Sequence, residues 1–124
     1  MNLLTINKER LLSKLKELGK IGGLENGGVS RLALTDDDQK GRDLVVSWME
    51  ELGLKVQIDQ IGNIIATRKG SQNRKPIMMG SHIDTVKNGG IYDGNLGVLA
   101  GLEVIHTLND ANLSTKGPIQ MAVF

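Results

Sequence analysis

The most informative stretch of this chain is "PIMMGSHIDTVKNGGIYDGNLGVLAGLEVIHTL", from Pro76 to Leu108, where an apolar strand passes through a glycine-rich loop into an apolar helix. The "PIMMG" run, Pro76–Gly80, is short and apolar on both faces, which predicts a central buried strand. The segment Leu96–Leu108 predicts a helix because apolar residues recur on one side of it: Val98, Leu102 and Ile105. The loop between the two elements carries polar side chains of catalytic types: His82, Asp84 and Asp93.

Outward from this stretch, the spacing of apolar residues predicts five further elements. One leucine stripe predicts an amphipathic helix over residues 5–19, and a second apolar stripe predicts a helix over residues 36–52. Alternating residues predict two strands at 54–59 and 63–70 that form a hairpin, and "PIQMAVF", residues 118–124, predicts another buried strand. The order α, α, β, β, β, α, β indicates an α/β fold with a mixed, partly parallel sheet flanked by helices.

Composition excludes several classes of function. The net charge is +1, from 15 basic and 14 acidic residues, and only 2% of the residues are aromatic, so neither a nucleic-acid nor an anionic membrane surface is expected. The chain has no cysteine, which excludes a thiolate site and fits a reducing compartment. The N-terminus lacks the apolar core of a signal peptide, and no apolar run approaches the ~18 residues of a membrane span. We therefore expect a cytoplasmic protein.

The polar side chains of the loop lie where open α/β sheets bind ligands. In an extended "HID" segment, His82 and Asp84 project to one side and Ile83 to the other. The segment follows the carboxyl end of a predicted strand, which is the functional edge of such sheets. Asp93 comes eleven positions after His82, and a turn through two adjacent glycines would return it to the imidazole. An imidazole with two carboxylates at this edge indicates a functional site, and a metal site is one interpretation of it.

Other interpretations of the same residues compete with the metal site. His82, taken alone, is more often a structural or surface histidine, and Asp93 before Gly94 fits an N-cap or a turn residue. A phosphate loop is disfavoured because "GGIYDGNLG" lacks the lysine and the serine or threonine of a P-loop. His106, in the predicted helix, is interpreted as structural or exposed.

The motif "GSHIDTVKNGGIYDGNLGVLAGLEVI" resembles the metal-binding signature of the di-zinc amidohydrolases of the aminoacylase and exopeptidase superfamily. More narrowly, it resembles the N-carbamoyl-L-amino acid hydrolase and allantoate amidohydrolase family. "GGVSRLALTDDDQKGRDLVVSWMEELGLKVQIDQIGNIIATRKG" is similar to the N-terminal region of that family, so the resemblance covers nearly the whole chain. It implies a di-zinc exopeptidase-like catalytic domain.

The resemblance implies a role for each candidate residue. His82 would be a ligand of one metal ion, and Asp93 the carboxylate that bridges two ions. Asp84 would be a catalytic-site residue that orients His82 and raises the basicity of its imidazole. The expected cofactors are two divalent metal ions, with zinc preferred over manganese, cobalt and nickel. The expected substrate is a small molecule, an N-carbamoyl-L-amino acid that is hydrolysed to amino acid, ammonia and carbon dioxide.

The resemblance also implies parts that this sequence does not contain. In the family, the strand equivalent to residues 118–124 is followed by two glutamates, a general base and a metal ligand, and later by further histidines and a lid-like dimerisation domain. We therefore expect residues 1–124 to be the N-terminal portion of the catalytic domain of a homodimeric enzyme, inactive by itself. The alternatives are an allantoate or β-ureidopropionate amidohydrolase, or a noncatalytic α/β fragment that binds a partner.

Overall fold

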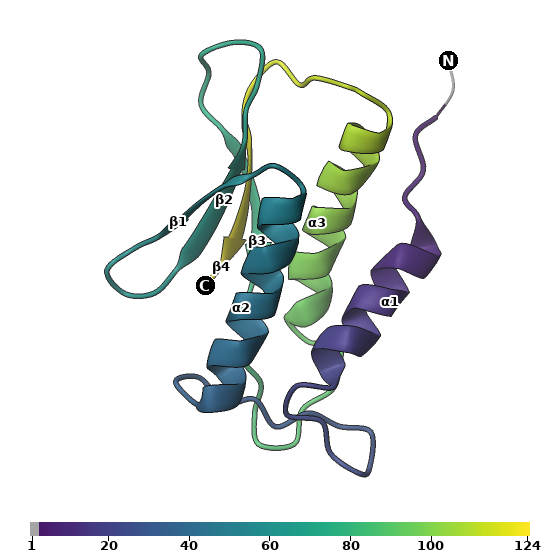
Figure 1. Ribbon diagram of the computed structural model, residues 1–124, viewed down its shortest axis with the longest axis vertical. Helices are drawn as coiled ribbons and strands as arrows, with labels where there is room; N and C mark the ends of the chain where they lie inside the picture. The colour runs from purple at the N-terminus through teal and green to yellow at the C-terminus, as the bar shows by residue number, and fades with distance from the viewer. Residues whose placement is uncertain (1–2) are drawn as a thin grey trace.

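The computed structural model describes residues 3–124, so the first two residues of the expected 1–124 domain lie outside the described part. It confirms the predicted α/β class and the order of the elements (Figure 1). The elements are α1 (Lys8–Gly19), α2 (Asp36–Glu51), β1 (Lys55–Ile58), β2 (Ile64–Arg68), β3 (Ile77–Ser81), α3 (Asn95–Asp110) and β4 (Ile119–Val123). Among residues 3–124, no helix has the length and apolar character needed to cross a membrane.

The four strands form one mixed sheet in the order β1-β2-β4-β3. The predicted hairpin is confirmed, since β1 and β2 pair antiparallel with Ile58 opposite Ile64. β4 pairs antiparallel with β2 and parallel with β3, to which α3 connects it. The carboxyl ends of β3 and β4 therefore lie side by side, with the backbone N–H of Phe124 donating to the Ser81 carbonyl at 2.9 Å.

The prediction that "PIMMG" forms a central buried strand is wrong. Among residues 3–124, β3 is an edge strand, and the side chains of Ile77 and Met78 are 72% and 46% exposed. Within residues 3–124, only β4 pairs with it, and no helix covers the face of the sheet opposite α2 and α3 (Figure 1). The central strands are β2 and β4, which contribute Ala66, Met121 and Val123 to the core.

The helices pack on one face of the sheet, with α2 against β1, α3 against β3 and β4, and α1 against α3 (Figure 1). The N-terminal helix begins at Lys8 rather than at residue 5, because the Asn7 side chain accepts a hydrogen bond from the Arg10 backbone and caps the helix there. α3 approaches the sheet closely through two glycines. A Cβ atom at Gly97 would lie 2.8 Å from the Cβ of Ser81, and one at Gly101 would overlap Met121. The start of α3 is thereby held against the carboxyl end of β3.

A buried ion pair joins α1 to α3 and carries a prediction on stability. The Glu103 carboxylate is 3% exposed and accepts hydrogen bonds from Arg10 Nε at 2.8 Å and from the Asn7 backbone at 2.8 Å. Burial raises the pKa of Glu103, but the hydrogen bonds from Arg10, Asn7 and Thr107 outweigh it and hold that pKa below the ordinary value of 4.5.

Because the pKa of Glu103 is lowered by folding, the ionised carboxylate stabilises the protein above about pH 4.5, and this contribution is lost as the pH falls through the folded-state pKa. Glu103→Gln should lower the free energy of unfolding by about 1.5–3 kcal/mol at pH 7, the range for a hydrogen bond to a charged group. It should also flatten the acid limb of a plot of stability against pH, measured by urea unfolding. An unchanged acid limb in Glu103→Gln would contradict the stabilising role of the ionised Glu103 carboxylate.

Candidate active site

The candidate residues gather at the carboxyl end of β3, as the sequence predicts. β3 ends at Ser81, and the chain continues through His82, Ile83 and Asp84. Ile83 is 1% exposed and belongs to the hydrophobic core, whereas the other two side chains are each 41% exposed. The buried isoleucine therefore anchors the segment and turns the imidazole and the carboxylate to the opposite side.

Asp84 fixes the orientation of the His82 imidazole. The Nδ1 atom of His82 lies 3.0 Å from the backbone carbonyl oxygen of Asp84 and 3.3 Å from its carboxylate Oδ1. Both neighbours only accept hydrogen bonds, so in the neutral imidazole the proton resides on Nδ1. The Nε2 lone pair is then free to bind a metal ion. The closer acceptor is the carbonyl rather than the expected carboxylate.

Asp93 approaches the free side of the imidazole. Its carboxylate Oδ2 lies 4.0 Å from His82 Nε2, and its side chain is 87% exposed. The interpretation of Asp93 as the N-cap of α3 is wrong, because the N-cap is Gly94 and no side chain caps the helix. Instead, the Asp93 carbonyl accepts a hydrogen bond from the Asn95 backbone at 2.8 Å, which closes a three-residue γ-turn around Gly94.

Gly94 lets the two segments of the site meet. Its φ of +70° and ψ of −52° belong to the rare, strained form of the γ-turn. A Cβ atom at this position would lie 2.5 Å from the Cε1 atom and from the carbonyl oxygen of His82, and 2.6 Å from Nδ1. The sequence predicts that glycines in this loop let the backbone approach an ion or substrate. In the structure, Gly94 approaches the imidazole itself.

The donor set fits one side of a metal site. A neutral imidazole nitrogen and a carboxylate oxygen suit zinc, at about 2.0–2.2 Å from the ion. The 4.0 Å between His82 Nε2 and Asp93 Oδ2 leaves room for an ion between them, and the exposed aspartate is free to adjust. Residues 3–124 contain no group of three or more histidine, cysteine, aspartate or glutamate side chains placed to hold a metal ion. The described residues therefore offer fewer than the three ligands that a catalytic zinc usually takes from protein.

Arg31 also contacts the segments of this site, although the sequence predicts only a loop role for it. Its side chain is fully buried, and the Nε atom donates to the Ile83 carbonyl at 2.9 Å. Nη2 donates to the Asn95 side chain at 3.1 Å, directly after the Gly94 turn. The arginine thus contacts both segments of the site. Its position in a glycine-rich loop without periodicity gives no sequence signal of burial, and its contacts with Ile83 and Asn95 lie 52 and 64 residues away along the chain.

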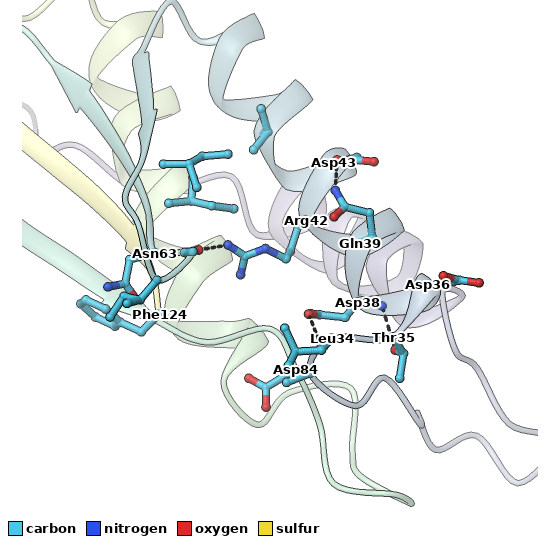
Figure 2. Close-up of a pocket in the computed structure, with 16 residues that line it drawn as sticks. Leu34, Thr35, Asp36, Asp38, Gln39, Arg42, Asp43, Asn63, Asp84 and Phe124 are labelled. Atoms are coloured by element: carbon cyan, nitrogen blue, oxygen red, sulfur yellow. Dashed lines mark hydrogen bonds between the residues drawn. The ribbon is translucent and has the colours of Figure 1, made fainter.

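A cavity of about 610 Å³ opens beside Asp84. The start of α2 and the β1–β2 turn form its walls, with Asp84 and Phe124 among the lining residues (Figure 2). The Arg42 guanidinium bridges the two walls by donating to the Gly62 carbonyl. Three aspartates of α2 also line the cavity: Asp36, Asp38 and Asp43. Asp84 therefore stands between this acidic cavity and the imidazole of His82.

The second histidine lies apart from these residues. His106 is on α3, its side chain is 29% exposed, and its Nε2 atom lies 3.7 Å from the carboxylate of Asp110 one turn later. This geometry agrees with its interpretation as structural or exposed.

The fold of this chain also occurs in solved structures of amidases. The chain superposes on a hydantoinase/carbamoylase family amidase from Burkholderia ambifaria with a TM-score of 0.96 and 46% identity, covering 99% of this chain and 31% of that one. The same fold occurs in the aminopeptidase PepT from Bacillus cereus, at 21% identity and a TM-score of 0.77.

The chain belongs to peptidase family M28, which matches residues 63–124. It is also similar to the N-carbamoyl-L-amino-acid amidohydrolase of Pseudomonas sp. (strain NS671), with 44% identity over 100% of this chain and 30% of that protein. Allantoate deiminase 1 of Glycine max is 31% identical over 96% of this chain and 25% of its own length. The chain thus spans about 30% of the length of the first of these relatives. The family is of the metal-dependent amidohydrolase and peptidase type.

Proposed function

We propose that the protein is a metal-dependent amidohydrolase that cleaves linear ureido C–N bonds, with N-carbamoyl-L-amino acids as substrates. The observation that carries the proposal is the approach of the Asp93 carboxylate to Nε2 of His82, whose Nδ1 faces the Asp84 carbonyl. The amidohydrolase of Pseudomonas acts on N-carbamoyl-L-amino acids by its name, and its 44% identity exceeds the 31% of the soybean allantoate deiminase. These identities favour the carbamoyl substrate over allantoate.

In this proposal each of the three residues has a role that its geometry supports. His82 offers Nε2 as a metal ligand, while the Asp84 carbonyl and carboxylate hold the Nδ1 proton and make the imidazole a stronger donor. Asp93 offers a carboxylate that is suited to bridge two ions. Two bound divalent ions would supply a hydroxide nucleophile at neutral pH and polarise the substrate carbonyl. We prefer zinc on the nitrogen and oxygen donor set, with manganese, cobalt or nickel as alternatives.

The proposal requires a general base and further ligands besides the residues described above. The carboxyl end of β4 is well placed for them, because Phe124 is hydrogen bonded to Ser81, the residue before His82. Residues 1–124 would then be the N-terminal portion of the catalytic domain. We extend the proposal to a homodimer in the cytoplasm, the location that the cysteine-free sequence fits.

The test is metal removal from the full-length protein. Dialysis against a chelator should abolish the release of ammonia from N-carbamoyl-L-amino acids, and zinc, manganese or cobalt should restore it. Allantoate and β-ureidopropionate serve as competing substrates in the same assay. Ammonia release that survives complete chelation, or that is absent for every ureido compound with metal present, would overturn the proposal.

A further inference from the structure

The Arg31 guanidinium is hydrogen bonded to three separate segments of the chain. Nη1 donates to two carbonyls at the end of α1, those of Leu18 at 3.0 Å and Ile21 at 2.6 Å. Nε and Nη2 donate to the Ile83 carbonyl and to the Asn95 side chain. The planar guanidinium carries its donors on three separate nitrogen atoms and so reaches acceptors that lie far apart, whereas the three donors of a lysine ammonium share one nitrogen.

The guanidinium charge has no direct counterion. Among residues 3–124, Arg31 forms no ion pair, and all four side-chain acceptors are neutral oxygens. Burial lowers the pKa of the guanidinium, while the more distant carboxylates of Asp38, Asp37 and Asp84 oppose this shift. A buried charge without a counterion is costly, and the four hydrogen bonds of the guanidinium offset this cost. An apolar residue would fill the same space but leave all four acceptors without this donor. The arginine therefore joins the three segments and does more than fill the core.

The backbone of Arg31 adds a second connection to the site. Its N–H donates to Thr85 Oγ1 at 2.8 Å, and its carbonyl accepts from the Thr85 backbone at 2.7 Å. The arginine is therefore bonded to the residues on both sides of Asp84. The Asn95 side chain, which accepts from Nη2, in turn donates to the Ile91 carbonyl at 3.1 Å. This second chain of bonds spans the segment that contains Asp93.

We propose that Arg31 is a positioning residue that sets the distance between His82 and Asp93 by binding both of their segments at once. The inference rests on the proposed metal site, because it assigns to Arg31 the preorganisation of that site. Residues that orient metal ligands commonly change metal affinity by about 10–100-fold when they are replaced. A purely structural arginine would change stability but not the metal affinity of the folded protein.

The test compares Arg31→Lys with Arg10→Lys in the full-length protein. Arg10→Lys is the matched control. It also replaces a guanidinium by an ammonium, but Arg10 binds Glu103 and Asp110 on α3 and does not contact the candidate site. Zinc affinity is measured by competition with a chromogenic chelator, and ligand geometry by the visible absorption of the cobalt-substituted protein. Arg31→Lys should weaken zinc binding about 10–100-fold and change the cobalt spectrum, whereas Arg10→Lys should lower the melting temperature and leave both metal readouts unchanged.

The outcomes separate the inference from the proposed function. Equal zinc affinities and cobalt spectra for Arg31→Lys and the wild type would overturn the inference and leave the proposed function intact. A wild type that binds no metal would overturn the proposed function itself. If Arg31→Lys does not fold, Asn95→Leu replaces it, because this variant removes both bonds through which Arg31 reaches the Asp93 segment, the acceptor for Nη2 and the donor to the Ile91 carbonyl. Unchanged zinc affinity in folded Asn95→Leu would also overturn the inference.

Discussion

In the full-length protein, Asp93→Ala is expected to remove bound metal and hydrolytic activity together. The carboxylate is the only partner found for the free Nε2 side of His82 in residues 3–124, and it is highly exposed, so its removal leaves the backbone contacts of the loop in place. Activity should fall at least as far as it does on removal of a catalytic acid or base, about 10²–10⁴-fold. The measurements are metal content by mass spectrometry and ammonia release.

His82→Ala and His106→Ala form the matched comparison for this prediction. His82→Ala should reproduce the loss of metal, whereas His106→Ala removes the imidazole of α3 that lies beside Asp110 and should leave metal and activity unchanged. Full metal content in purified Asp93→Ala would contradict a bridging role for this carboxylate.

Gly94→Ala is expected to damage both the fold and the site. The positive φ and the strained γ-turn should cost an alanine about 1–3 kcal/mol, and the contacts of the added Cβ with His82 should add a comparable penalty. Both the imidazole and the backbone carbonyl of His82 would have to move, since the Cβ would lie 2.5 Å from Cε1 and from the carbonyl oxygen. The melting temperature and the zinc affinity of Gly94→Ala should therefore both be lower than those of the wild type.

Gly53→Ala separates the two causes of this loss. Gly53 has a similar φ of +76°, but nothing lies within 4 Å of the position that a Cβ would occupy. The control should lose about 1–2 kcal/mol of stability for the positive φ and keep its metal. Equal effects of the two substitutions on zinc affinity would show that Gly94 serves the turn alone and does not make room for His82.

Local pattern was enough to predict most of the elements and the gathering of the candidate residues. The alternation in "HID" places Ile83 in the core and leaves His82 and Asp84 on the other side, as the structure confirms. This succeeds because side-chain direction in an extended segment depends on neighbouring residues alone. The approach of Asp93 to His82 was also predictable from local sequence, because the glycine-rich loop between the two residues is short.

Sequence pattern failed where distant parts of the chain decide the structure. An apolar run such as "PIMMG" is typical of a central strand, but the place of a strand in the sheet depends on which other strands pair with it. Here only β4 does so within residues 3–124. The burial of Arg31 was equally unpredictable, because its acceptors Ile83 and Asn95 lie 52 and 64 residues further along the chain.

The most direct test of the metal site is a crystal structure of the full-length protein with zinc added, with anomalous data collected at the zinc absorption edge. We expect an anomalous peak about 2.0–2.2 Å from both His82 Nε2 and a carboxylate oxygen of Asp93. The Nδ1 atom should still face the Asp84 carbonyl. Zinc bound elsewhere, with His82 Nε2 hydrogen bonded to protein or water, would contradict the account.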